Sequence, residues 1–126
     1  MEFKIDTRAG GDASREEKLE AARTRMAELA RRFLDRSEMD LAAMQGGLRR
    51  IGEGDTTAVG DIRHLAHRMV GTGATLGFEA LSECAQQLEK LTEKCLPGTL
   101  PGDDARDRIA CELDALQAEL RKLRDS

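Results

Sequence analysis

Residues 59–78 read VGDIRHLAHRMVGTGATLGF and combine a periodic apolar pattern with a glycine that ends it. The apolar or small residues recur at intervals of three and four, at Val59, Ile62, Leu65, Ala66, Met69, Val70, Gly73 and Leu76. This spacing is typical of one buried face of an α-helix. Gly77 follows the last of them, at a place where glycine commonly terminates a helix. The stretch therefore predicts a helix that ends in a turn, after which the next helix folds back against it.

The same spacing recurs on both sides of this stretch. It predicts further helices over residues 14–33, 37–52 and 78–95, and a last one whose apolar seam spans 109–123. Pro97, Gly98, Pro101 and Gly102 separate the last two helices. Five amphipathic helices with short connections predict an all-α fold, namely an up-down antiparallel four-helix bundle with an additional N-terminal helix. We expect a flexible N-terminal segment over residues 1–13, which lack periodicity, and one helical bundle domain over residues 14–126.

Composition limits the classes of partner. The net charge of -4 argues against a general nucleic-acid binder, which needs a surplus of Lys and Arg to neutralise phosphates. Aromatic residues make up only 2% of the chain, so platforms for base stacking have little to be built from. No apolar run at the start suits a signal peptide, and no stretch of about 18 apolar residues is present. We therefore expect a cytoplasmic protein with no membrane and no nucleic-acid partner.

Two glycines and three cysteines leave alternatives open. Gly46 and Gly47 weaken the middle of the second predicted helix, either for close helix packing or as a docking surface. Cys84, Cys95 and Cys111 are odd in number and lack the Cys-x-x-Cys spacing of metal sites. We expect reduced and mostly buried thiols, with a disulfide or a zinc site as the alternative.

His67 lies outside the apolar stripe of its predicted helix. At about 100° per residue it falls roughly 130° from the centre of that stripe. Gly71 and Ala74 lie on the same outward side, and His64 lies almost opposite the core. Glycine costs a helix interior about 0.5–1 kcal/mol relative to alanine, and a merely solvated histidine gains nothing from it. Either both histidines are ordinary surface residues, or the small neighbours expose the imidazole of His67 to another protein.

Glu89 is a candidate neighbour of His67. Folding back at Gly77 places the two residues roughly 15 and 18 Å from the turn, which is within one helical turn of the same level. Glu89 lies at the edge of the apolar stripe of its own helix, so its carboxylate is either solvated or accepts a hydrogen bond from one ring nitrogen. That hydrogen bond fixes the tautomer and leaves the other nitrogen as an oriented nucleophile.

Taken together, these residues resemble the histidine-containing phosphotransfer (HPt) domain of two-component phosphorelays. The family pattern matches this sequence at His67, Met69, Gly71, Thr72, Gly77, Phe78, Leu88 and Glu89. The resemblance covers about residues 26–123. Only His67, and not His64, has glycine at the fourth following position, because Arg68 stands four residues after His64.

The resemblance implies a function and its partners. His67 is then the phosphoacceptor that relays a phosphoryl group between receiver-domain aspartates, from a hybrid histidine kinase to a response regulator, and Glu89 orients its imidazole. The receiver supplies Mg²⁺, and the chain needs no cofactor of its own. Gly71 and Ala74 admit the rim of the receiver's active site. The sequence offers no strong dimer seam, and we expect a monomer.

The sequence departs from the family at one position near the acceptor. Many members carry a lysine three residues after the histidine, where Val70 stands here. Arg63, Arg68 and Lys90 are the candidates to replace its positive charge, and with His64 they are expected to contact the partner. The resemblance implies that Arg63 and Arg68 favour the transferring phosphate.

Three other classes of function remain as alternatives. An interaction module with the same bundle binds a kinase or receiver without phosphotransfer. A metal site at His64 and His67 lacks the third and fourth ligands that zinc normally takes, and we expect none. A hydrolase triad lacks the strand-turn-helix elbow that presents its nucleophile.

Overall fold

The computed structural model describes residues 2–126, with side chains from Ser14 onward. These residues form four helices and no strand: α1 (Glu2–Gly52), α2 (Ala58–Thr75), α3 (Glu79–Glu93) and α4 (Asp103–Asp125). The chain divides into two units, the first ending at Arg32 and the second running from Phe33 to Ser126. The expected flexible segment spans residues 1–13. Met1 and the side chains of residues 2–13 lie outside the part that the structure describes, so this expectation stays untested.

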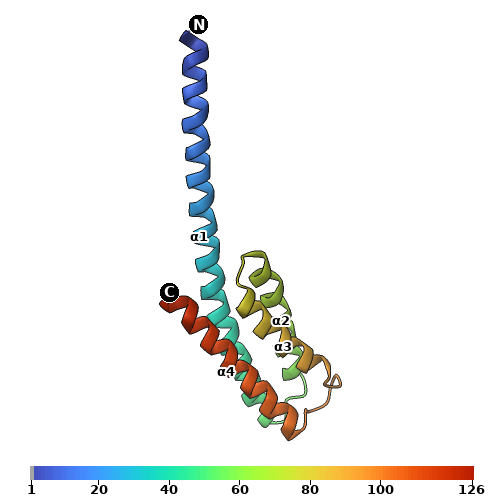
Figure 1. Cartoon of the computed structure of the whole chain (residues 1–126). Coiled ribbons are helices and arrows are strands. Elements are labelled where there is room, and N and C mark those ends of the chain that lie inside the picture. The colour runs from blue at the N-terminus through green and yellow to red at the C-terminus, as the bar shows by residue number, and fades with distance from the viewer. Residues whose placement is uncertain (1) are drawn as a thin grey trace. The chain divides into compact units, whose positions relative to one another are not determined.

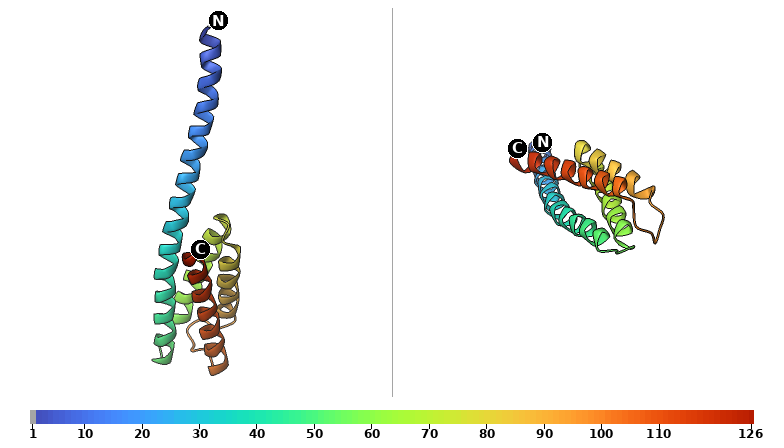
Figure 2. Two further views of the ribbon diagram at one scale, coloured as in Figure 1. Left: turned by 60° about the vertical axis from the view of Figure 1, so that its left-hand side comes forward. Right: turned by 90° about the horizontal axis from the view of Figure 1, so that it is seen from below.

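The second unit is a four-helix bundle. In Figure 1 the C-terminal part of α1 and the three following helices lie side by side and alternate in direction, and Figure 2 shows the same arrangement from two other sides. One apolar cluster joins them, with its fully buried side chains at Met44, Ala58, Ile62, Ala66, Leu81, Ala85, Leu88, Ile109 and Leu116. Each fully buried Leu, Ile or Met contributes about 1.5–3 kcal/mol to folding. The predicted all-α, up-down antiparallel bundle is confirmed.

α1 is one continuous helix, so the break predicted between residues 33 and 37 is wrong. Phe33, Ser37, Asp40, Leu41 and Met44 are all buried, which means that one buried face continues through this stretch. Two of these five residues are polar, and this hid the stripe in the sequence. Neither glycine nor proline occurs between Phe33 and Met44 to interrupt the helix. The additional N-terminal helix is therefore the N-terminal part of α1.

In the first unit, the larger apolar side chains of α1 are exposed. Leu19, Met26 and Leu29 expose 54%, 49% and 47% of their surface. Their three-and-four spacing predicted a helix, and that prediction is confirmed. Across both units, no helix among the described residues combines the length and the apolar character needed to cross a bilayer.

Gly47 allows α1 and α2 to pack closely. A Cβ atom built at this position would lie 2.9 Å from Cγ1 of Ile62, which is closer than side chains tolerate. Gly46 is less restricted, because a Cβ there would meet only Nη2 of Arg49, at 3.6 Å. Close helix packing, one of the two alternatives for this glycine pair, is confirmed at Gly47.

The three cysteines are free thiols. Cys84 and Cys95 are half-buried, and burial raises the pKa of both thiols. Cys111 is exposed, so the expectation of mostly buried thiols is wrong. The reason is its place on α4: it lies two residues after the buried Ile109, and a helix turns by about 200° over two residues.

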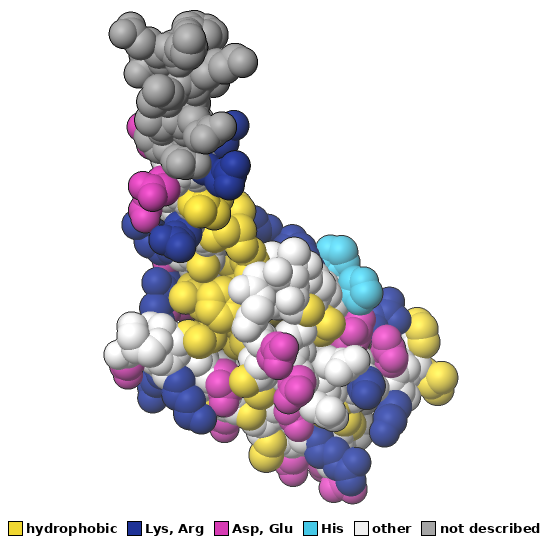
Figure 3. Space-filling view, turned by 45° about the horizontal axis from the view of Figure 1, so that its top comes forward, with side chains coloured by type: hydrophobic (Ala, Val, Ile, Leu, Met, Phe, Trp, Pro, Cys, Tyr) yellow, Lys and Arg dark blue, Asp and Glu magenta, His cyan; other side chains and the backbone are white. Residues whose placement is uncertain are grey.

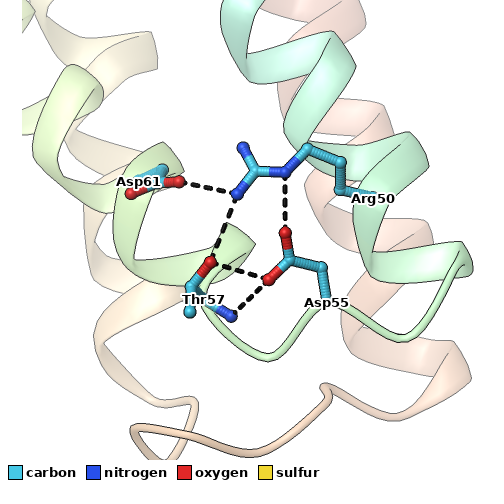
Figure 4. Close-up of polar contacts among 4 residues, drawn as sticks. All are labelled: Arg50, Asp55, Thr57 and Asp61. Atoms are coloured by element: carbon cyan, nitrogen blue, oxygen red, sulfur yellow. Dashed lines mark hydrogen bonds and ion pairs between the residues drawn. The ribbon is translucent and has the colours of Figure 1, made fainter.

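A polar network around Arg50 holds the connection from α1 to α2 (Figure 4). Nε of Arg50 donates to Asp55 at 2.8 Å, and Nη2 donates to Asp61 at 2.8 Å and to the hydroxyl of Thr57 at 3.3 Å. Asp55 also accepts hydrogen bonds from the hydroxyl and the backbone N–H of Thr57, at 2.7 and 2.9 Å. The hydrogen bonds from Thr57, followed by the one from Arg50, lower the pKa of Asp55 to about 2.

This network predicts a specific acid dependence of stability. Because the folded-state pKa of Asp55 lies below its ordinary value of 3.8, its carboxylate stabilises the fold above that value, and this stabilisation is lost as the pH falls through about 2. We expect Asp55→Asn to lower the urea midpoint of unfolding near neutral pH, and the difference from wild type to shrink as the pH approaches 2. Urea unfolding followed by circular dichroism measures it.

The matched control is Asp114→Asn, which removes an exposed aspartate of α4. We expect its midpoint to follow the wild type at every pH. A difference between wild type and Asp55→Asn that stays constant down to pH 2 would contradict the assignment.

Candidate functional site

α2 turns its two histidines toward solvent. Its buried residues are Ala58, Val59, Ile62, Ala66, Met69 and Gly73. His64, His67, Gly71 and Ala74 are exposed, as their predicted places on the outward side require. The side chain of His67 exposes 74% of its surface. The predicted orientation of this helix is therefore confirmed.

The turn after α2 brings α3 against it. Gly77 has a φ of 85°, a conformation that favours glycine. The backbone N–H of Phe78 donates to the carbonyl of Gly73 at 2.8 Å. A Cβ at Gly73 would lie 3.4 Å from Cβ of Ser82, and the hydroxyl of Ser82 donates to the carbonyl of Val70 at 2.9 Å. These contacts hold the C-terminal part of α2 close to α3.

His67 and Glu89 are hydrogen-bonded between these two helices. Nδ1 of His67 donates to Oε2 of Glu89, whose side chain is only 16% exposed. A carboxylate only accepts, so the proton lies on Nδ1 and the neutral ring carries its lone pair on Nε2. No hydrogen bond to Nε2 is formed by any of the side chains that the structure describes. The arrangement leaves an oriented nucleophile on an open surface.

The ring of His67 borders a depression of about 280 Å³ between α2 and α3. Its lining residues are Arg63, His64, His67, Glu89 and Glu93. Figure 3 shows the histidine side chains together on the surface, with acidic and basic side chains beside them. Sequence reasoning missed Glu93, although its spacing of four from Glu89 puts both carboxylates on one helix face.

The other two candidate cations lie away from this depression. Nη2 of Arg68 donates to Asp40 of α1 at 2.9 Å. Asp40 is a buried carboxylate that sequence reasoning did not connect with the site, because the pairing exists only between helices. Lys90 lines a different depression, of about 590 Å³, between α3 and α4. Of the basic residues proposed to contact a partner, Arg63 and His64 are the ones that border the acceptor.

The metal alternative at His64 and His67 gains no further ligand. Within residues 14–126, no group of three or more His, Cys, Asp or Glu side chains is arranged to hold a metal ion.

Comparison with known families agrees with this geometry. A family model described as the Hpt domain matches residues 28–126, which is most of the chain. The matched range includes His67, Glu89 and all four helices of the bundle unit. Searches of curated proteins and of solved structures gave no significant match.

The hydrogen bond to Glu89 predicts one tautomer of His67. We expect Glu89→Ala to lower the fraction of neutral His67 that carries its proton on Nδ1, because the acceptor that favours this form is removed. Nitrogen-15 NMR of the ring nitrogens measures the two tautomers. Glu93→Ala is the matched control, since it removes a carboxylate from the same depression that makes no hydrogen bond to the ring. Identical tautomer fractions in wild type and Glu89→Ala would overturn the assignment.

Proposed function

Because the chain belongs to the Hpt domain family, we propose that it relays a phosphoryl group between receiver-domain aspartates through His67. Hpt domains carry out histidine phosphotransfer in two-component phosphorelays and interact with their receiver domains and kinases. The proposed direction is from a hybrid histidine kinase to a response regulator. The observation that carries the proposal is the exposed imidazole whose Nδ1–H is held by the largely buried Glu89.

The chemistry is an in-line displacement at phosphorus. The lone pair of Nε2 attacks the phosphorus of a receiver's aspartyl phosphate, so an N–P bond forms and the acyl O–P bond breaks. The aspartate leaves as a carboxylate with the bonding electron pair. On the second leg, the aspartate of another receiver attacks the same phosphorus, and the N–P electron pair returns to Nε2.

Glu89 acts on this step through the ring. As Nε2 forms its bond to phosphorus, positive charge develops on the imidazole, and the carboxylate at the opposite nitrogen stabilises that charge. The same hydrogen bond keeps Nε2 directed outward before any partner arrives, which reduces the orientational part of the barrier. Glu89 is thus proposed as a positioning residue, and the phosphoryl group is bonded to Nε2 rather than Nδ1.

The residues around His67 do not fit a magnesium site. The depression offers two carboxylates, of which Glu89 is already hydrogen-bonded to the ring, and Arg63 lies beside them. Mg²⁺ prefers an octahedral shell of oxygen ligands, and a guanidinium at the site opposes it. The proposal therefore assigns the metal to the receiver and derives no step through it.

Small residues beside His67 support docking of a large partner. Gly71 lies one turn after His67, and a Cβ atom there would meet nothing within 4 Å. Packing inside the bundle therefore does not explain the glycine. Ala74 continues the exposed surface of small side chains by one further turn. Such a surface admits the rim of a receiver close enough for the two reacting atoms to meet.

The direct test is transfer from a phosphorylated receiver domain in the presence of Mg²⁺. We expect the full chain to become labelled on His67, with an acid-labile and alkali-stable bond that phosphorus-31 NMR identifies as Nε2-phosphohistidine. His67→Ala should abolish the label, and His64→Ala should retain it. Absence of label with every receiver and kinase tried, together with binding to one of them, would favour a non-catalytic interaction module.

Graded bulk at position 71 tests the docking argument. We expect Gly71→Leu to reduce the initial rate of transfer by about tenfold or more, because a displaced partner loses the alignment of the reacting atoms. Gly71→Ala should retain most of the rate. Both substitutions should keep or raise the thermal midpoint, since both residues favour helix over glycine and a Cβ atom at this position meets no neighbour. A normal rate of transfer by Gly71→Leu would contradict the argument that the partner docks against the small residues beside His67.

A further inference from the structure

The phosphoryl group proposed for Nε2 of His67 would occupy a depression with charged walls. Arg63 and His64 of α2 lie on one side of it, and Glu89 and Glu93 of α3 lie on the other. The structure of this depression decides which groups of the chain act on the phosphoryl oxygens. The inference drawn below rests on the proposed role of His67 as the phosphoacceptor.

The other nearby cations are occupied or elsewhere. The guanidinium of Arg68 is bound to the buried Asp40, and Lys90 faces the separate depression between α3 and α4. Position 70, one turn after the acceptor, holds a valine that packs against the core. Among the described side chains, the basic residues that line the depression are Arg63 and His64, in the turn that precedes His67, and none comes from the turn that follows it.

Arg63 and His64 are suited to bind phosphoryl oxygens. Arg63 is exposed and forms no ion pair with any side chain of residues 14–126, so its N–H donors are available. A guanidinium presents a planar set of donors that matches phosphate geometry. His64 lies three residues before His67 on the same helix and has at least one N–H donor in either tautomer.

Glu93 acts in the opposite sense. Its carboxylate lines the same depression, one turn after Glu89, and its side chain makes no hydrogen bond or ion pair within the described part of the chain. Glu89 is engaged by the ring, whereas Glu93 borders both this depression and the one that Lys90 lines. Like charges that line one depression repel, so Glu93 weakens the hold on a phosphoryl dianion.

We infer that Arg63 and His64 form a phosphoryl-oxygen subsite for phosphorylated His67, and that Glu93 on the opposite wall counteracts them. The chain then holds the phosphoryl group only weakly by its own charges. The additional positive charge for transfer is then left to the partner, which approaches the open side of the depression. A weakly held group is easily passed on, which suits a relay rather than a store.

The test uses the full chain phosphorylated chemically with phosphoramidate, which needs no partner protein. Phosphorus-31 NMR then follows the ionisation of the phosphohistidine as the pH is varied above the acid range in which the bond hydrolyses. We expect Arg63→Gln to raise the pKa of the phosphohistidine by about 0.5, since a nearby cation favours its deprotonated form. His64→Ala should raise it by less, and Glu93→Gln should lower it by about as much as Arg63→Gln raises it.

Lys90→Gln is the matched control, because it removes one positive charge from the neighbouring depression. Its phosphoryl group should titrate as in the wild type. Equal titration curves for wild type, Arg63→Gln and Glu93→Gln would overturn the subsite, and so would equal shifts for Arg63→Gln and Lys90→Gln. His67→Ala, which should lose the signal, assigns the label to His67.

The two proposals fail in different ways. One result is that receivers fail to label His67, while the pKa of the chemically phosphorylated chain rises in Arg63→Gln and falls in Glu93→Gln. The subsite is then supported and the relay is contradicted. If receivers label His67 but the pKa is the same in wild type, Arg63→Gln and Glu93→Gln, the relay is supported and the subsite is contradicted. If neither route phosphorylates His67, both fall.

Discussion

The hydrogen bond between His67 and Glu89 joins two helices, and it forms only because α2 and α3 are held close together and in register. Gly73 leaves no side chain where the helices approach, and Gly77 adopts the positive φ that reverses the chain at once. The hydroxyl of Ser82 then ties α3 to a carbonyl of α2. A shift of one residue along α3 would rotate Glu89 by about 100° and remove it from the ring.

Other charged side chains of the bundle unit are used for structure. Arg50 holds the connection between α1 and α2, and Arg68 pairs with the buried Asp40. At the end of α4, Arg124 donates to Asp35 and Glu38 of α1, and these hydrogen bonds raise its pKa above the ordinary value. Each of these cations has a carboxylate partner on another element or in the turn. The contrast explains why the surface around His67, where Arg63 is unpaired among the described side chains, has groups left over for binding.

The site is a shallow, open surface rather than a deep pocket. Its helix buries one face in the core and leaves the opposite face to small or polar residues, so the imidazole is fixed at one nitrogen and accessible at the other. In the proposed relay, two different partners meet the same atom, and a shallow surface permits both encounters. The rigid bundle below supplies orientation, since the carboxylate that fixes the ring is itself largely buried.

The sequence alone determined the helices and their outward faces. Its three-and-four spacing placed both ends of α2 and α3 and the C-terminal end of α4 within a few residues, because burying one stripe is a local requirement of an amphipathic helix. The apolar seam did not mark the start of α4, which lies at Asp103. Counting along the helices from Gly77 also brought Glu89 level with His67. The same spacing failed between Phe33 and Asp40, where buried Ser37 and Asp40 looked like a break.

Only the tertiary structure decided which charges act at the site. Asp40 and Arg68 are far apart in sequence, as are Arg124 and its partners, and no local pattern assigns such pairs. Packing between helices pairs Arg68 with Asp40 and places Lys90 at a different depression, so neither residue borders His67. The same packing places Glu93 beside His67. Helix periodicity fixes the direction of a side chain relative to its own axis, whereas its neighbours depend on how the axes pack.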